Sequence, residues 1–392
     1  MGLACALLAA CVSPAPTPSG TAEASLPPDS PSDEGAARAL GQLDWVFSPP
    51  ANILGGPTGS YSLQAGTLAD GEPLVDLEVP WRAELGDGIA REPAVGAPHG
   101  GSVVYVADDG ARSDVRRAEI AADGADHSLA TLDEVVWDIV VAPDGSAAYA
   151  AIVDRAKTTR DLGVVRIHLD GSRSVEPVLP PAQLGAADTV RPVAVIAFQV
   201  SLAMSLDGEH LIRRTCAEAG SCLVEVAALA SGRVAELPDR EILGGAAGLI
   251  VAQHCDVHGC RLETLDIASS STASVEVDAF GTVVEVGGAP VVVAMVNDGR
   301  DSLTLEAVDP ASGRRSLLYR IPDGATMTFG DFLFLTIDVP PGLVHVIETK
   351  PIRAGDDTIG MDERHVLVSV ADGRIIELPE PAYDAPWTGT QG

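Results

Sequence analysis

Cysteine and histidine side chains are concentrated near the middle of the chain. The residues from His254 to Cys260 read HCDVHGC, and a second close pair of cysteines lies upstream at Cys216 and Cys222. In an exported protein, such local pairs are typical of disulfides that close a hairpin. A metal site is the alternative, and its soft and imidazole donors would be His254, Cys255, His258 and Cys260. That spacing matches no common zinc pattern, so we expect two disulfides, Cys216–Cys222 and Cys255–Cys260, and no bound metal or other cofactor.

Acidic residues near the C-terminus form a second candidate group for chemistry. Asp356, Asp357, Asp362 and Glu363 lie in one segment, flanked by His345 and His365. Such a set could bind calcium or supply an acid and a base. Because the whole chain is strongly acidic, we favour a solvated loop.

Other patterns that carry chemistry are weaker still. Asp108, Asp109 and Asp114 lack the ligand spacing of an EF-hand loop and indicate a polar turn. No Gly-x-Ser-x-Gly nucleophile motif is present in the sequence. The glycines from Gly244 to Gly248 precede a strand rather than a helix, so they do not predict a phosphate-binding loop. We therefore assign no catalytic residue.

The composition of the chain excludes some classes of partner. The 392 residues carry a formal net charge of −31, and the only lysines are Lys157 and Lys350. So much negative charge repels nucleic-acid phosphates and anionic lipid headgroups. With 46% apolar residues the chain has ample material for a core. We expect a protein, most simply a monomer, that does not bind nucleic acid.

The first eleven residues resemble the signal of a bacterial lipoprotein. Leu8, Ala9, Ala10 and Cys11 match the four positions of the lipobox, in which the signal is cleaved before a cysteine that then carries diacylglycerol. The resemblance implies a mature chain that begins at a lipidated Cys11, on the extracytoplasmic side of a cell membrane. A secretory signal has a basic start, whereas the first basic residue here is Arg38, so we expect the coding start to lie upstream of Met1.

The domain organisation follows from composition. Residues 1–10 are the predicted signal peptide. Residues 11–41 are rich in Pro, Ser, Ala and acidic side chains and predict a disordered tether. Residues 42–380 consist of short runs of β-branched residues separated by Gly, Asp and Pro, which predict an all-β domain. Residues 381–392 are a C-terminal tail.

The strands of the all-β region repeat. A tight turn recurs along the chain at Asp70-Gly71, Asp123-Gly124, Asp170-Gly171, Ser231-Gly232, Ser269-Ser270, Ser312-Gly313 and Asp372-Gly373. An earlier glycine opens another hairpin in six of these units, at Gly101, Gly145, Gly208, Gly248, Gly288 and Gly330. A period of about forty residues with four short strands is typical of a β-propeller blade. Seven late turns therefore predict seven blades.

Two of the hairpins also resemble a known family. The run from Trp137 to Tyr149 contains Ala142-Pro143-Asp144-Gly145, which is similar to the Ser-Pro-Asp-Gly motif of TolB-type and WD40-like propellers, and Ser205-Leu206-Asp207-Gly208 is a weaker copy. The resemblance implies the propeller fold.

The irregular parts of the repeat predict where a ligand binds. With the strands of a blade named A to D, extra length lies in the D–A connections before Gly101 and Gly208, and in a B–C insertion at about residues 338–364. Both cysteine pairs also bracket B–C loops. All these features fall on one face, and loops on a rigid scaffold often carry binding.

Two classes of function follow. We favour a non-catalytic module that binds a protein, peptide or glycan on this face. The alternative is a propeller hydrolase or lactonase with groups from several blades in the central channel, for which the sequence offers no evenly spaced set. One strand stays ambiguous, because residues 43–48 could belong to the first blade or complete the last one beside Ile375 to Leu378.

Overall fold

The computed structural model describes the repeating region of the chain. The described residues are 45–47, 59–66, 73–82, 84–85, 89–90, 93–119, 126–155, 163–181, 200–216, 222–238, 240–256, 259–276, 280–297, 303–321, 325–329, 335–337, 339, 341–354 and 357–378. Within these ranges every regular element is a β-strand. None of the described segments is a helix long and apolar enough to cross a membrane.

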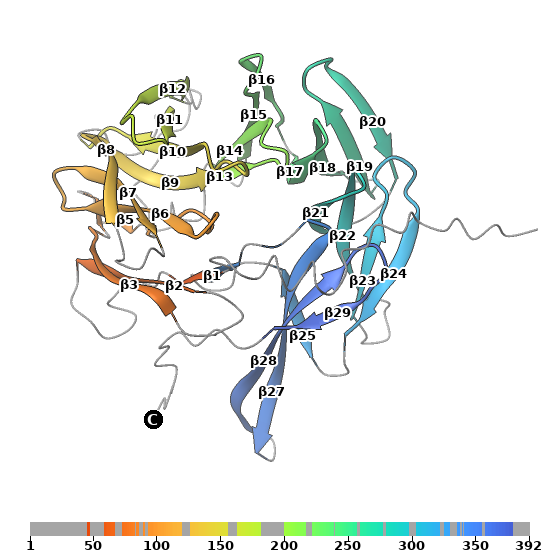
Figure 1. Cartoon of the computed structure of the whole chain (residues 1–392). Helices are drawn as coiled ribbons and strands as arrows, with labels where there is room; N and C mark the ends of the chain where they lie inside the picture. Colours follow the sequence, from red (N-terminus) through yellow and green to blue (C-terminus); the bar gives the residue numbers. More distant parts are fainter. Residues whose placement is uncertain are drawn as a thin grey trace, which may run out of the picture. The chain divides into compact units, whose positions relative to one another are not determined.

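Seven antiparallel sheets follow one another along the chain, and they confirm the predicted seven-bladed β-propeller (Figure 1). Six sheets have four described strands and the seventh has three, besides one small hairpin of two strands. Inner strands of successive blades contact each other, as β9 and β13 do, and β17 and β21.

The first three blades use residues from the N-terminal half and one later strand. Their strands are, from inside to outside, β26 (Leu335–Ile337), β1 (Trp45–Phe47), β2 (Ser60–Gly66) and β3 (Pro73–Pro80); then β6 (Ser102–Asp108), β7 (Ser113–Glu119) and β8 (Asp126–Leu132); then β9 (Val135–Val141), β10 (Ala147–Val153), β11 (Gly163–His168) and β12 (Val175–Leu179).

The fourth to seventh blades follow in sequence order. They contain β13 (Val200–Met204), β14 (His210–Cys216), β15 (Cys222–Ala228) and β16 (Arg233–Glu236); β17 (Glu241–Ala246), β18 (Leu249–Asp256), β19 (Gly259–Asp266) and β20 (Ser271–Val275); β21 (Phe280–Val286), β22 (Ala289–Asn297), β23 (Leu303–Val308) and β24 (Arg315–Arg320); and β25 (Thr326–Phe329), β27 (Leu343–Ala354), β28 (Asp357–Ser369) and β29 (Ile375–Glu377).

The second blade has an irregular inner strand. Val95 forms a bridge with Tyr105 of β6, the amide of Gly96 donates to the carbonyl of Val104, and the amide of Val106 donates to the carbonyl of Ala94. The segment around Val95 therefore occupies the inner position that the repeat requires, with too few ladder bonds to count as a full strand.

The predicted turns lie between the strands as the repeat requires. Gly145 joins β9 to β10 with a φ of +67°, a conformation that residues with a Cβ adopt rarely. A Cβ at Gly145 would also lie only 2.4 Å from the imidazole of His99 in the preceding A–B turn. At Gly208, between β13 and β14, the nearest atom would be Cδ of Pro143, at 3.2 Å. Glycine at these two positions thus permits both the positive φ of the turn and the close contact with the preceding blade.

The core is divided among the interfaces between blades. Side chains alternate along each strand, so one side of a sheet packs on the preceding blade and the other side on the following blade. Leu211 of β14 belongs to a cluster with Val135 and Tyr149 of the third blade, whereas Ile212 belongs to a cluster with Ile250 and Leu265 of the fifth. Apolar burial of this kind is the main force that holds successive blades together.

The sequence left open whether residues 43–48 belong to the first blade or complete the last one. The structure shows the first of these, with one added strand that neither alternative included. The strand at residues 45–47 does belong to the first blade, where β1 pairs with β2. On its other side β1 pairs with β26, which comes from between β25 and β27 of the last blade. The A–B connection of the last blade therefore supplies the inner strand of the first one.

This arrangement corrects the prediction for the last unit. Gly330 does not open a simple hairpin, because β26 intervenes before the chain returns as β27. The extra residues are shared between this connection and a lengthened B–C hairpin, β27 and β28, which projects from the blade (Figure 1). Of the two predicted D–A expansions, the first contains the small hairpin of β4 (Glu84–Leu85) and β5 (Ile89–Ala90). Most of the second, 182–199, lies outside the described residues.

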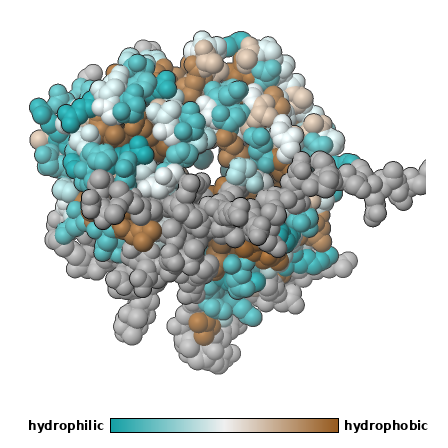
Figure 2. All heavy atoms as spheres, in the orientation of Figure 1, coloured by the Kyte–Doolittle hydropathy of each residue, from teal (hydrophilic) through white to brown (hydrophobic). Residues whose placement is uncertain are grey.

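The surface of the described blades is mainly hydrophilic on the face that Figure 2 shows, with smaller hydrophobic areas between the hydrophilic ones. Large exposed apolar side chains are scattered over several blades: Leu74, Val175, Leu206, Val234, Leu317, Ile352 and Ile375. Single exposed apolar residues of this kind are ordinary on a soluble surface.

Candidate functional site

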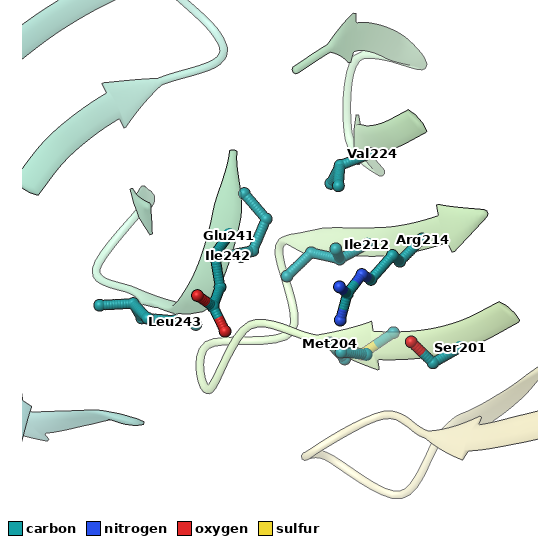
Figure 3. Close-up of a pocket in the computed structure, with 10 residues that line it drawn as sticks. Ser201, Met204, Ile212, Arg214, Val224, Glu241, Ile242 and Leu243 are labelled. Carbon is teal, nitrogen blue, oxygen red and sulfur yellow. The ribbon is translucent and has the colours of Figure 1, made fainter. Parts of the chain in front are cut away.

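A pocket lies between the fourth and fifth blades (Figure 3). It has a volume of about 180 Å³. Ten residues line it: Ser201, Ala203, Met204, Ile212, Arg214, Val224, Glu241, Ile242, Leu243 and Gly244. They come from β13, β14 and β15 of the fourth blade and from β17 of the fifth.

Strand register explains how the fourth blade builds its side of the pocket. Arg214 is paired with Ser201 on β13 and with Val224 on β15. Ile212, two residues before Arg214, is paired with Ala203 and points to the same side of the sheet. One face of three strands therefore presents an apolar area next to a guanidinium group.

The fifth blade builds the other side from the start of its inner strand. The pairing of β17 with β18 shifts between Ile242 and Gly244, so consecutive residues around this bulge contribute to the wall. Gly244 adopts a φ of +145°, and a Cβ there would lie only 2.9 Å from Cβ of Val283 in the sixth blade. Gly244 therefore allows close packing against the sixth blade, while its neighbours on β17 form the pocket wall.

Polar groups are few and lie at one end of the pocket. Arg214 and Glu241 are exposed and approach the space from different blades, while Ile212 and Val224 are buried (Figure 3). Arg214 is near the end of a B strand and Glu241 at the start of an A strand. The charged end therefore faces the B–C and D–A side, where the sequence predicted the ligand to bind.

The two cysteine pairs lie at the same side of these two blades. Cys216 and Cys222 are directly opposite each other in the pairing of β14 with β15, and their side chains lie outside the described residues. Cys255 and Cys260 occupy the corresponding place in the fifth blade, with their Cα atoms 4.0 Å apart, and a disulfide joins them. Each hairpin ends within a few residues of the lining residues Arg214 or Glu241.

The alternative metal site at His254, Cys255, His258 and Cys260 does not fit this arrangement. Both sulfur atoms are in the disulfide, so neither is a thiolate ligand. Nδ1 of His254 lies 3.0 Å from Nη2 of Arg261 and 3.6 Å from a carboxylate oxygen of Glu263. His258 lies outside the described side chains. The disulfide thus removes two of the four candidate ligands, Cys255 and Cys260.

Glu263 organises the charges behind this disulfide. Its carboxylate, which is only 4% exposed, accepts bonds from Nε of Arg240 at 2.6 Å and from Nε of Arg261 at 3.0 Å. Burial alone would raise the pKa of Glu263, but the two guanidinium groups outweigh it and hold that pKa below its usual value. The carboxylate of Glu263 is therefore an anion that holds Arg240 and Arg261 in place.

The structure describes only part of the acidic candidate group near the C-terminus. His345 and His365 stack inside the last blade, with Nε2 of His345 3.1 Å from Nδ1 of His365, whereas Asp362 is exposed. The side chains of Asp356 and Asp357 lie outside the described residues.

The acidic turn of the second blade, with Asp108, Asp109 and Asp114, forms hydrogen bonds and ion pairs within the fold. The carboxylate of Asp108 is buried and holds both terminal nitrogens of Arg155, at 3.0 and 3.3 Å. Asp109 accepts bonds from the backbone of its own turn, and Asp114 pairs with Arg116. These groups are used within the fold, as a polar turn predicts.

Sequence reasoning missed the pocket itself. Arg214 and Glu241 stand in ordinary strand contexts, and nothing in their local pattern marks them. The one available signal was the position of both strands beside the cysteine hairpins. Cys11 and the tether belong to the part of the chain that the structure does not describe, so the lipid anchor stays a prediction.

Comparison with known proteins agrees with the fold. No protein-family model matches the sequence, and no curated protein is significantly similar to it. Among solved structures, a puromycin hydrolase is 15% identical with a TM-score of 0.52, covering 88% of this chain and 53% of that one. A puromycin-hydrolysing peptidase from Mycobacterium tuberculosis is 16% identical with a TM-score of 0.50, covering 90% of this chain and 55% of that one.

TolB from Acinetobacter baumannii is also similar, at 12% identity and a TM-score of 0.37, covering 82% of this chain and 76% of that one. This chain thus spans about half the length of the two hydrolases and three quarters of TolB. The class that the fold defines is the seven-bladed β-propeller.

Proposed function

We propose that this protein is a cell-envelope lipoprotein whose propeller is a non-catalytic binding module. Its ligand is a protein or peptide segment that inserts one apolar side chain into the pocket between the fourth and fifth blades. The observation that carries the proposal is the pocket itself, with an apolar interior and the charged residues Arg214 and Glu241 at its outer end.

The size of the pocket favours a side chain over a whole small molecule. Pockets for drug-sized ligands usually have about 300–1,000 Å³, whereas this one has about 180 Å³. A side chain would bury its apolar atoms against Met204, Ile212 and Val224. Arg214 and Glu241 would then meet the carbonyl and amide groups of the ligand backbone on either side.

The lining residues also favour a peptide over a glycan. Only Ser201, Arg214 and Glu241 bring polar side chains to the pocket. A sugar ring would bury several hydroxyl groups here, and each buried hydroxyl without a partner is costly. One apolar side chain needs no hydrogen-bond partner in the pocket.

The distribution of ionisable groups supports binding rather than catalysis. Within the described residues, a single group of three His, Cys, Asp or Glu side chains lies within metal-binding range, and all three members come from one hairpin. A channel enzyme needs such groups from several blades at one point. The pocket itself contains one carboxylate and one guanidinium, without a nucleophile–base pair.

Membrane attachment in this proposal depends on Cys11. Several acyl chains on one cysteine hold a protein firmly, whereas a single chain binds only weakly. An oxidising compartment outside the cytoplasm also suits the disulfide of Cys255 and Cys260 and the proposed one of Cys216 and Cys222.

The ligand hypothesis is tested by filling the pocket. Ala203 is an exposed residue that lines it, and Ala203→Trp would occupy its space. The matched control is Ala273→Trp, at an exposed position on the outer strand β20. Crosslinking and pull-down from intact cells should recover a partner with the parent and with A273W and lose it with A203W. Recovery of no partner, together with turnover of a small-molecule library, would overturn binding in favour of catalysis; a recovered glycan would overturn the peptide.

The anchor hypothesis has its own test. Cys11→Ala should abolish labelling by a fatty-acid analogue and release the protein from the membrane fraction, while Cys5→Ala should change neither. Equal membrane retention of both variants would contradict the lipoprotein assignment without touching the pocket.

A further inference from the structure

The turn between β13 and β14 gathers three potential metal ligands. One ligand atom each from Asp207, Glu209 and His210 lies within 4.8 Å of the other two. This A–B turn is at the opposite end of the strands from Arg214, so the group is separate from the pocket and independent of the proposed function.

His210 is the unusual member of the group. Its side chain is only 3% exposed, and its Nδ1 is buried without a hydrogen-bond partner among the described residues. Imidazole nitrogens are strong donors or acceptors, and leaving one unpaired in a protein interior is costly. A bound cation would remove that cost, since a neutral imidazole nitrogen is a common metal ligand.

Asp207 is held in place as an anion. Its Oδ1 accepts bonds from the hydroxyl of Ser205 and the amide of Glu209, and its Oδ2 accepts the amide of Gly248 in the fifth blade at 2.6 Å. Each carboxylate oxygen has two lone pairs, so Oδ2 keeps one for a further ligand.

Glu209 is the exposed member of the group. One of its carboxylate oxygens lies 3.4 Å from the position that a Cβ on Gly248 would take. Ligand atoms around a tetrahedral zinc are only about 3.3 Å apart. An exposed carboxylate can rotate inward by the distance needed, while Asp207 stays fixed.

We propose that Asp207, Glu209 and His210 form a zinc site. Two carboxylates and one imidazole suit zinc, with water as a fourth ligand, and they do not suit calcium, which takes six to eight oxygen ligands. Two negative charges balance the ion, and the acidic chain attracts cations. Because Asp207 also holds the amide of Gly248, the ion would strengthen the joint between the fourth and fifth blades.

The test measures zinc binding to the tag-free full chain with its disulfides kept oxidised, so that cysteine thiolates do not compete. Equilibrium dialysis in excess Mg²⁺, which occupies sites made of carboxylates alone, should show one tightly held Zn²⁺ per chain. Glu209→Gln should weaken zinc binding at least about tenfold, because it removes one ligand from an exposed position. His210→Gln should do the same.

The matched control is Glu236→Gln, at an exposed glutamate on the outer strand of the same blade. It should leave the zinc affinity unchanged. Zinc should also raise the thermal midpoint of the parent and of E236Q, but not of E209Q. No stoichiometric zinc binding by the parent, or an affinity of E209Q equal to that of the parent, would overturn the proposal, whatever the fate of H210Q.

Discussion

The two faces of strand β14 show how one blade makes two kinds of interface. On the face toward the third blade, Leu211 is fully buried in an apolar cluster and Arg213 is fully buried with its charge paired. On the face toward the fifth blade, Ile212 lines the pocket and Arg214 is exposed. Adjacent residues of similar chemistry thus have opposite surroundings.

The difference originates outside β14. Toward the third blade, the inner strand β9 also shifts its register beside Asp138, but Asp138 accepts the amide of Leu202 at 2.7 Å, which joins the two blades closely. Toward the fifth blade, β17 carries a bulge and two consecutive glycines, Gly244 and Gly245. The pocket therefore forms where the fifth blade packs less closely against β14, and not where β14 itself is polar.

The largest expected effect is a difference in unfolding free energy between variants of Arg213 and Arg214. Nε of Arg213 donates to Glu225 at 2.7 Å, and its Nη1 donates to the carbonyl of Pro180 at 2.8 Å. Breaking a buried ion pair leaves an unpaired buried charge, so Arg213→Ala should cost about 3–5 kcal/mol of unfolding free energy. Arg214→Ala should cost less than about 1 kcal/mol, as surface substitutions do. Urea unfolding of both variants checks this, and equal losses would refute the contrast.

The apolar neighbours should differ less. Leu211→Ala opens a new cavity in a packed cluster and should cost about 3–4 kcal/mol. Ile212→Ala enlarges a pocket that already exists and removes fewer contacts, so we expect about 2 kcal/mol. The same urea experiment provides the measurement. A larger loss for I212A would mean that the pocket wall is packed as tightly as the third-blade interface.

The disulfide at the rim of the pocket should contribute about as much as Ile212. Its short loop predicts a loss of about 2 kcal/mol when Cys255 and Cys260 are both replaced by Ser. Thermal unfolding with and without reductant gives the value. The double variant should be insensitive to reductant at this site, so a residual response would report on the proposed second disulfide at Cys216 and Cys222.

Near neutral pH the smallest effect is that of the buried imidazole pair of the last blade, His345 and His365. Burial, and to a lesser degree the charge of His365, lowers the pKa of His345 to about 3, and burial also lowers the pKa of His365. In the unfolded chain each titrates near about 6.5. The unfolded state then binds more protons between these values, so stability is complete above about pH 6.5 and falls as the pH is lowered toward 3.

The expected slope is at most about 1.4 kcal/mol per pH unit for each imidazole. Unfolding free energies measured at several pH values for the parent and for His345→Leu test it. The variant should show a flatter dependence, and an unchanged slope would assign the acid sensitivity to the carboxylates instead.

Much of the fold could be predicted from the sequence, because its signals are local. Turns such as Asp170-Gly171 and Gly145 require conformations that few residues adopt, so they mark the strand ends directly. Their regular spacing then implied the blades. Closure could not be predicted in the same way, because β26 is a short strand whose partner, β1, lies at the other end of the chain. No local pattern carries information about so distant a pairing.

The candidate site likewise has features that the local sequence predicts and features that depend on packing between blades. The sequence by itself determined the number of blades and the hairpin positions of the cysteines, since both depend on residue types at short spacing. Only the tertiary structure decided that Arg214 and Glu241 share a pocket and that His210 is buried beside two carboxylates. Both depend on how the fourth and fifth blades pack, and packing between blades is set by shape and volume that no single strand records.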